Sequence, residues 1–225
     1  MPTKLCSLKR LILALMLLMA TLTAPAAALT PQEVVAQVQQ KYDITGAFKA
    51  YFQQQSGLRA SGAIDTAEGW VYFRKPCQMR WEYLNPPGQR KEVIADGQQV
   101  WIYIPQDRMA MVYPLEQVMR SDLVMRFFSG MGNLQEDFTI SWRRPYREDS
   151  PLKIDLRPVT PQAELKWLAL TIDPQSYQVQ EIEFANTYGD LTHINFSQLQ
   201  LNIKLPADFF SFTPPPDVEV VKELM

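Results

Sequence analysis

An alternation of apolar and polar side chains over residues 77–83 constrains the fold of this chain more than any other feature. Every second residue of this stretch is apolar (Cys77, Met79, Trp81 and Tyr83), and the residues between them are polar. Successive side chains of an extended strand point to opposite faces of a sheet. The stretch therefore predicts a strand in a sheet with one buried face and one face in water, as antiparallel sheets often have.

Similar strand-like runs follow one another after Gly46. Asp96-Gly97, between 92–95 and 98–104, is a strong signal for a two-residue hairpin. Further strands are expected at 48–52, 70–74, 109–113, 138–142, 152–156, 165–172, 177–184, 191–196 and 209–213. This succession of short strands predicts an antiparallel sandwich or barrel. In 100–104 both faces are apolar, so the pattern leaves open which of them points inward.

Two helices are expected beside the strands. The first begins at Thr30, where Thr30 and Glu33 form a capping box, Pro31 occupies the first helical position and Leu29 can pack onto Val34. The second interrupts the strand pattern at 115–128, with apolar residues near helical spacing at Leu115, Val118, Met119 and Leu123. A helix with apolar side chains must bury them, so we expect this one to lie across the concave face of a curved sheet as a lid.

Residues 1–28 have the three parts of a secretory signal peptide. Basic residues precede an apolar run over 11–22, and small residues fit cleavage after Ala26 or after Ala28. A membrane anchor is the alternative, although the run is short for a bilayer span. Removal of the segment leaves 29–225 as a single domain, whose one cysteine, Cys77, excludes an intramolecular disulfide.

Composition excludes several classes of function. The chain has 22 basic and 24 acidic side chains and a net charge of −2, so we expect no nucleic-acid partner. One histidine and two cysteines are too few for the usual zinc sites, so no metal or other cofactor is expected. A histidine-based triad could use only His193, which reads as a surface residue. Glu181, Glu183 and Asp190 could be imagined as a hydrolytic pair, but solvated strand faces have the same pattern, and we expect no enzyme.

An ordered set of motifs resembles the outer-membrane lipoprotein carrier family, LolA. It comprises Phe48-x-x-x-Phe52-x-Gln54, Gly69-Trp-Val-Tyr-Phe-Arg-Lys-Pro76, Met79-Arg-Trp-Glu-Tyr83, Ala95-Asp-Gly97, Val100-Trp-Ile-Tyr-Ile-Pro105, Gly130-Met-Gly-Asn-Leu134, Asp137-Phe138, Phe210-Ser-Phe-Thr-Pro-Pro215 and Val218-Glu-Val220. The resemblance implies an unclosed antiparallel β-barrel with a helical lid, working in the periplasm of a Gram-negative bacterium. Members of the family take acylated lipoproteins from an inner-membrane ABC-type release complex and deliver them to an outer-membrane acceptor.

The resemblance also implies a latch between lid and barrel. The family has Arg-Pro where this chain has Lys75-Pro76, with Arg74 before it. A lysine offers point-like donors where an arginine offers a fork, so the latch is expected to be weaker or differently supplied. Arg74 is a poor automatic substitute, because neighbouring residues of a strand face opposite ways.

Acyl chains need an apolar cavity with adaptable walls, for which methionine and aromatic side chains are suited. The expected acyl-binding residues are Phe52, Met79, Trp81 and Tyr83 on the sheet, and Val118, Met119, Leu123 and Phe127 on the lid. From periodicity alone the same residues read as ordinary core. We predict a monomeric lipoprotein carrier; a lipid-binding shuttle or an envelope-stress sensor of the same fold is the alternative.

Overall fold

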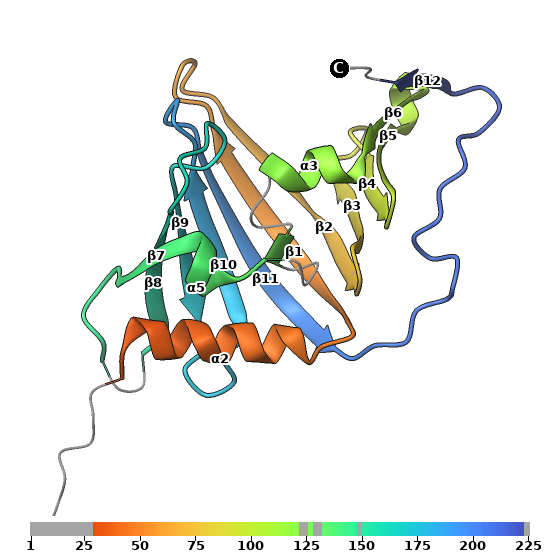
Figure 1. Ribbon diagram of the computed structural model, residues 1–225. Coiled ribbons are helices and arrows are strands. Elements are labelled where there is room, and N and C mark those ends of the chain that lie inside the picture. Colours follow the sequence, from red (N-terminus) through yellow and green to blue (C-terminus); the bar gives the residue numbers. More distant parts are fainter. Residues whose placement is uncertain (1–28, 122–125, 128–131, 148–149, 223–225) are drawn as a thin grey trace, which may run out of the picture.

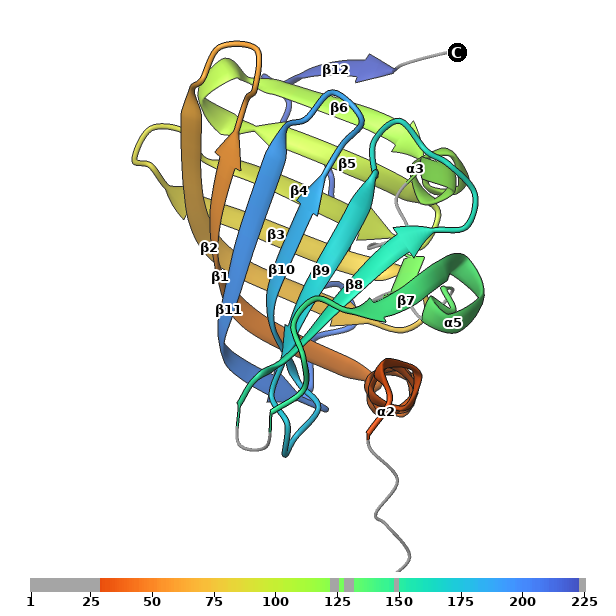
Figure 2. The same cartoon turned by 90° about the vertical axis from the view of Figure 1, so that its left-hand side faces the viewer.

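A computed structural model describes residues 29–121, 126–127, 132–147 and 150–222. One twelve-stranded sheet forms the framework, in the spatial order β12-β6-β5-β4-β3-β2-β1-β11-β10-β9-β8-β7. The strands are β1 Ala47–Gly57, β2 Ile64–Arg74, β3 Gln78–Asn85, β4 Lys91–Asp96, β5 Gln99–Ile104, β6 Met109–Pro114, β7 Phe138–Trp142, β8 Leu152–Pro158, β9 Trp167–Ile172, β10 Val179–Ala185, β11 Leu191–Leu201 and β12 Glu219–Lys222. The sheet curls into an open half-barrel, with the helices on its concave side (Figures 1 and 2). The expected unclosed β-barrel architecture is therefore confirmed.

Among the described residues, three α-helices lie on the concave side: α2 Pro31–Asp43, α3 Leu115–Ser121 and α5 Leu134–Asp137. The predicted capping box of α2 is present, because the Glu33 amide donates to Thr30 Oγ1 and the Glu33 carboxylate accepts from the Thr30 amide. Its buried side chains are Val34, Val35, Val38 and Tyr42. Figure 1 shows α2 crossing the lower end of the sheet. None of the helices within the described ranges is long and apolar enough to cross a bilayer.

The inner face of the sheet carries the core. Paired residues on neighbouring antiparallel strands share a face, so one row runs from Phe48 through Phe73, Met79 and Ala95 to Val100. All five side chains in this row are buried. This register answers the question that the sequence left open: Val100, Ile102 and Ile104 point inward, while Trp101 and Tyr103 point outward.

A C-terminal segment covers the outer face of β2–β6. The chain leaves β11, runs outside the sheet and returns as β12, which pairs with β6 in parallel (Figure 1). Phe209 packs edge-on against Tyr72 at 4.8 Å, and Phe212 lies 5.4 Å from Trp101 between ring centroids. The segment explains why the outer face of β5 is apolar as well as its inner face, since Phe212 packs on Trp101 and Tyr103 there.

Three predictions about local structure were wrong or incomplete. Residues 209–213 form turns and irregular backbone rather than a strand, and β12 was not foreseen. Cys77 lies in the turn before β3 with a φ of 58°, so it does not continue the strand's alternation. The lid helix is described as α3 and as helical residues 126–127, and 122–125 lie outside the described residues.

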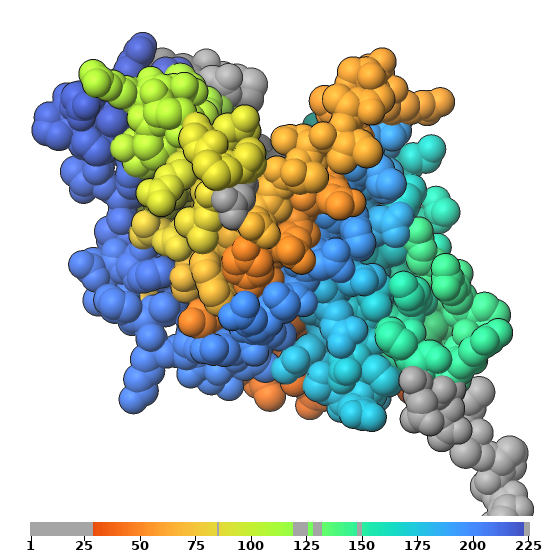
Figure 3. Space-filling view, turned by 180° about the vertical axis from the view of Figure 1, so that it is seen from behind, coloured from red at the N-terminus to blue at the C-terminus, as the bar shows by residue number. Residues whose placement is uncertain are grey.

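A β-bulge at Glu68 and Gly69 separates the first residues of β2 from β3. Beyond it, Ile64–Ala67 pair with β1 and not with β3. The β1–β2 hairpin then projects on its own, and Figure 3 shows it (orange) separated by a notch from the yellow and green strands. At Gly69 the backbones approach so closely that a Cβ would lie 1.8 Å from the Glu82 carbonyl oxygen.

We predict that Gly69→Ala destabilises the fold by about 1–3 kcal/mol, because the added methyl forces β2 away from β3. The measurement is urea unfolding followed by tryptophan fluorescence. Gly57→Ala is the matched control on the same hairpin, because its nearest neighbour is 3.8 Å from the added Cβ. Equal unfolding midpoints for the two variants would contradict the prediction.

Candidate functional site

An aromatic cluster occupies the middle of the concave face. Phe52 makes edge-to-face contacts with Trp81 at 4.8 Å and with Tyr83 at 5.1 Å between ring centroids. The rings of Trp81 and Tyr83 stack at 6.3 Å, and the Trp81 indole Nε1–H donates to Met79 Sδ at 3.0 Å. Three strands, β1, β3 and β11, contribute to this group, because Phe196 also lies 6.5 Å from Trp81. The site therefore consists of polarisable, flat side chains with few polar atoms.

A second aromatic group joins α2 to the sheet. Tyr42 lies edge-on to Phe48 at 5.5 Å and to Phe127 at 5.4 Å. Its hydroxyl oxygen accepts a hydrogen bond from the Val179 amide at 3.3 Å. Burial raises the pKa of Tyr42 to about 12, although this hydrogen bond opposes the shift. Phe127 thus reaches the α2 side of the concave face rather than standing apart from it.

The structure brings most of the predicted acyl-binding residues into one hydrophobic assembly. Phe52, Met79 and Phe127 are buried, while Trp81, Tyr83 and Val118 are partly buried against the same core. Met119 belongs to α3, but its side chain lies outside the described part of the chain, as does the whole of Leu123.

Burial across the concave face is uneven. Where α2 packs on the sheet, a small apolar cavity of about 10 Å³ is lined by Tyr42, Phe48, Ala50, Phe73, Val179, Phe196 and Leu199. Towards β4–β6, Ala95 and Val100 are buried, but six other inward side chains are only half-buried, namely Val93, Ile102, Ile104, Met109, Met111 and Tyr113. These six half-buried residues were not among the site residues expected from the sequence. The Asp96-Gly97 hairpin register could have placed Val93 and Ile102 on the same face.

Lys75 and Arg74 hold two different segments. The Lys75 ammonium donates to the Tyr42 and Asp43 carbonyls at 2.6 and 3.0 Å, at the C-terminal end of α2. Burial lowers the Lys75 pKa, and the Asp43 carboxylate 3.8 Å away opposes that shift. Arg74 instead donates to the Pro206 and Ala207 carbonyls at 2.8 and 3.0 Å, in the C-terminal segment. The two neighbours therefore reach different segments: Arg74, the last residue of β2, contacts the C-terminal segment, and Lys75, in the turn after it, contacts α2.

The carboxylates considered for hydrolysis form ion pairs and turn contacts. Glu183 accepts from Arg143 at 3.0 Å, and Glu181 lies 3.8 Å from Lys153 and 3.9 Å from His193. Hydrogen bonds from Asn186 and from the Arg59 amide lower the Asp190 pKa. Within the described ranges, no group of three or more His, Cys, Asp and Glu side chains is placed to hold a metal ion.

Buried tyrosines predict alkaline instability. Burial raises the pKa of both Tyr42 and Tyr83 to about 12, whereas an unfolded tyrosine titrates near 10. Above pH 10 the unfolded chain has lost protons that the folded chain retains, so the free energy of unfolding falls between about pH 10 and pH 12. We expect a loss of about 2–3 kcal/mol for each tyrosine across this window.

Urea titrations at a series of pH values measure this loss. Tyr83→Phe is expected to flatten the fall, whereas Tyr188→Phe, at a position 72% exposed, leaves it unchanged. The same alkaline slope in both variants would refute the assignment to buried tyrosine.

Comparisons with known proteins agree with this geometry. The family profile described as "Outer membrane lipoprotein carrier protein LolA" matches residues 43–213. A protein of Bordetella pertussis named outer-membrane lipoprotein carrier protein is 31% identical over 215 residues, which cover 93% of this chain and 95% of that one. A protein of the same name from Methylobacillus flagellatus is 26% identical over 180 residues, 80% of this chain and 84% of that one.

Among solved structures, an uncharacterized conserved protein of Thermus thermophilus superimposes with a TM-score of 0.55. It is 15% identical, and the match covers 85% of this chain and 98% of that one, which supports the fold alone. The family profile spans about three quarters of the chain and includes the aromatic cluster of β1 and β3. This chain belongs to the outer-membrane lipoprotein carrier family, LolA.

Proposed function

We propose that the protein carries acylated lipoproteins across the periplasm and delivers them to the outer membrane. The observation that carries this proposal is the continuous apolar face of the sheet, which helices cover incompletely over β4–β6. The names of the family and of its relatives from Bordetella and Methylobacillus support it.

The physical demand on such a carrier is reversible burial of acyl chains. Each methylene removed from water contributes about 0.8 kcal/mol, so a tightly fitting site would hold its cargo almost irreversibly. The cavity of about 10 Å³ beside α2 is far smaller than an acyl chain, which favours the half-buried side of the sheet as the place where acyl chains bind. Met109 and Met111 on the half-buried side adapt to irregular ligands.

In this proposal two sets of residues contact acyl chains. The sheet contributes Phe52, Met79, Trp81 and Tyr83, and the lid contributes Val118, Met119, Leu123 and Phe127. Lys75 acts as the latch by holding the end of α2, and Arg74 by fixing the C-terminal segment behind it. No cofactor or metal takes part, and no catalytic step is involved.

The setting of the proposed function follows from the same family. Residues 1–28 serve as an export signal, and 29–225 act as a single periplasmic domain. An inner-membrane ABC-type release complex supplies the lipoprotein, an outer-membrane acceptor receives it, and the carrier works as a monomer.

Native mass spectrometry of detergent-free protein from the periplasm tests the proposal. An acylated lipoprotein bound at one-to-one stoichiometry is the expected result. Free lipid alone would favour a lipid shuttle or an envelope-stress sensor, and protein that also fails to take up added lipoprotein would overturn the carrier function.

We predict that Phe127→Glu abolishes most lipoprotein uptake, because it places a charge against the apolar face next to Tyr42. The measurement is extraction of a lipoprotein from inner-membrane vesicles into solution. Ile64→Glu, at a position 75% exposed on the projecting hairpin, is the control and is expected to load normally. Normal extraction by Phe127→Glu would remove this residue from the site.

We expect Lys75→Ala to change the rate of lipoprotein transfer more than the melting temperature, because it frees two carbonyls at the end of α2. Transfer to acceptor-containing membranes and thermal unfolding are measured together. Lys204→Ala, an exposed position with the same loss of charge, serves as control. A large fall in melting temperature with unchanged transfer would contradict a latch.

A further inference from the structure

Two neighbouring turns at one end of the sheet expose large apolar side chains. The β1–β2 turn, residues 58–63, and the β10–β11 turn, residues 186–190, lie at the end of the sheet opposite α2 (Figure 1). Ile64 and Tyr188 are 75% and 72% exposed, and Leu58 and Leu191 are 49% and 41% exposed. We call these four residues the tip surface. Large apolar side chains grouped at one exposed place indicate a contact site, whereas single scattered ones do not.

The strand register brings the members of the tip surface together. Gly57, the last residue of β1, pairs with Leu191 on one side and with Ile64 on the other. Paired residues of neighbouring antiparallel strands share a face, so these two apolar side chains flank a position that has no side chain. Leu58 follows Gly57 directly in the chain. Three adjacent strands therefore end in apolar residues at the same place.

The two turns are also fastened to each other. The Arg59 amide donates to Asp190 Oδ1 at 2.9 Å. The Arg59 side chain lies against Gly189, because a Cβ added there would be 2.6 Å from Arg59 Cδ. Within the first turn, the Leu58 amide donates to the Ala63 carbonyl at 2.9 Å. Backbone groups that are hydrogen-bonded inside the turns lower the cost of moving the turns out of water.

Charge and size indicate what the tip surface contacts. The two turns contain one basic and one acidic residue, Arg59 and Asp190, whose charges cancel. Asp65 points to the concave side of the sheet, because it pairs with Ser56, which shares the face of the buried Phe52. A specific protein–protein interface uses about 20–30 residues on each side, far more than two turns offer. The head-group region of a bilayer accepts a few apolar side chains, and tyrosine is enriched at that depth.

We propose that the tip surface inserts shallowly into the head-group region of a lipid bilayer. Burial of apolar side chains drives this contact, so it is weak, reversible and independent of anionic lipid. It needs no cargo and does not depend on the proposed carriage of lipoproteins. Loading from the release complex is a separate step, so substitutions in the tip surface are expected to leave lipoprotein uptake unchanged.

A fluorescent probe on the tip surface tests the proposal. The mature chain with Cys77→Ser carries a nitrobenzoxadiazole group at Tyr188→Cys, and the emission of this group rises when it leaves water. Vesicles of phosphatidylcholine alone, and of phosphatidylethanolamine with phosphatidylglycerol, are added to the labelled protein. We expect the emission to rise about twofold with both kinds of vesicle, and the rise to persist in high salt.

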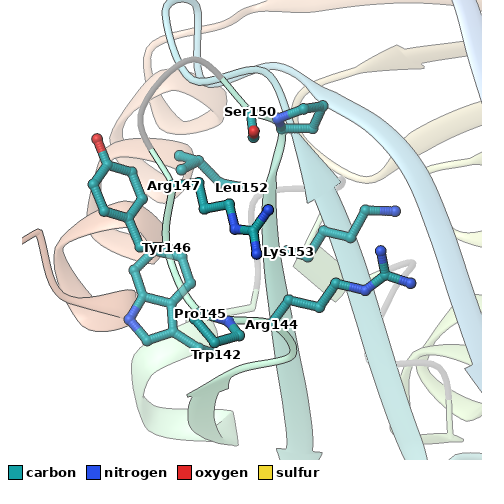
Figure 4. A pocket seen from close by; sticks show the side chains of 9 residues that line it. Trp142, Arg144, Pro145, Tyr146, Arg147, Ser150, Leu152 and Lys153 are labelled. Carbon is teal, nitrogen blue, oxygen red and sulfur yellow. The ribbon is translucent and has the colours of Figure 1, made fainter.

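Tyr146→Cys, labelled in the same way, is the matched control. Tyr146 is 42% exposed at the β7–β8 connection (Figure 4). The antiparallel order of β7–β11 places this connection at the other end of the strands from the β10–β11 turn. The probe at Tyr146→Cys is therefore expected not to respond to vesicles.

Variants of the tip surface measure its share of the binding. L58S/L191S in the chain labelled at Tyr188→Cys is expected to weaken vesicle binding about tenfold. Ile64→Ser, at the most exposed position of the tip surface, is a second variant that is expected to act in the same direction. Ile44→Ser, at a position 77% exposed beside the end of α2, removes a similar side chain and is expected to leave vesicle binding unchanged.

Several outcomes would overturn the proposal. These are no rise at Tyr188→Cys, an equal rise at Tyr146→Cys, and binding that is lost in high salt or with phosphatidylcholine alone. A rise that requires an added envelope protein would assign the tip surface to a protein partner and would also overturn it. L58S/L191S is expected to take up lipoprotein normally, and Phe127→Glu to keep the vesicle contact, so this proposal and lipoprotein carriage fail separately.

Discussion

One constraint shapes this molecule: a sheet that curls without closing leaves its apolar inner face for other elements to cover. The terminal strands β7 and β12 lie at opposite ends of the strand order. In a closed barrel the edge strands would pair with each other through backbone hydrogen bonds, and the barrel's own side chains would fill its interior. Here α2 packs beside β1, β7 and β10, whereas six inward side chains of β4–β6 stay half-buried next to the buried Ala95 and Val100. The inner face therefore has a fully buried part and a half-buried part, and the half-buried part is where the proposed function places the cargo.

The sequence predicted the inward-facing residues of the sheet better than the segments that pack around the sheet. The alternation correctly placed Phe52, Met79 and Trp81 on the buried face of the sheet. In a strand with one face in water, apolar and polar residues alternate, so residue type shows which face is buried. The start of α2 was also predicted correctly, since its capping box needs only two residues, Thr30 and Glu33, that are close in sequence.

The predictions were wrong where the same sequence pattern can arise from two different structures. Residues 209–213 are rich in phenylalanine and look like a strand, yet their rings pack on Tyr72 and Trp101 while the backbone forms turns. β12 has exposed side chains on both faces, so no alternation marks it, and its pairing with β6 joins residues distant in sequence. Both residues expected at the latch make backbone contacts, but to different segments: Lys75 donates to the end of α2, and Arg74 donates to the C-terminal segment.

The C-terminal segment supports the sheet from its outer side. Its phenylalanines shield the outer face of β2–β6, and Arg74 and Arg80 donate to its backbone carbonyls at 2.8 and 2.9 Å. The strands with half-buried inner side chains are also supported from the outer side, because Phe212 packs on Trp101 and Tyr103 of β5, and β12 pairs with β6. In the proposed function, these contacts hold the half-buried side of the sheet in shape before cargo binds, so little of the free energy of cargo binding is spent on organising it.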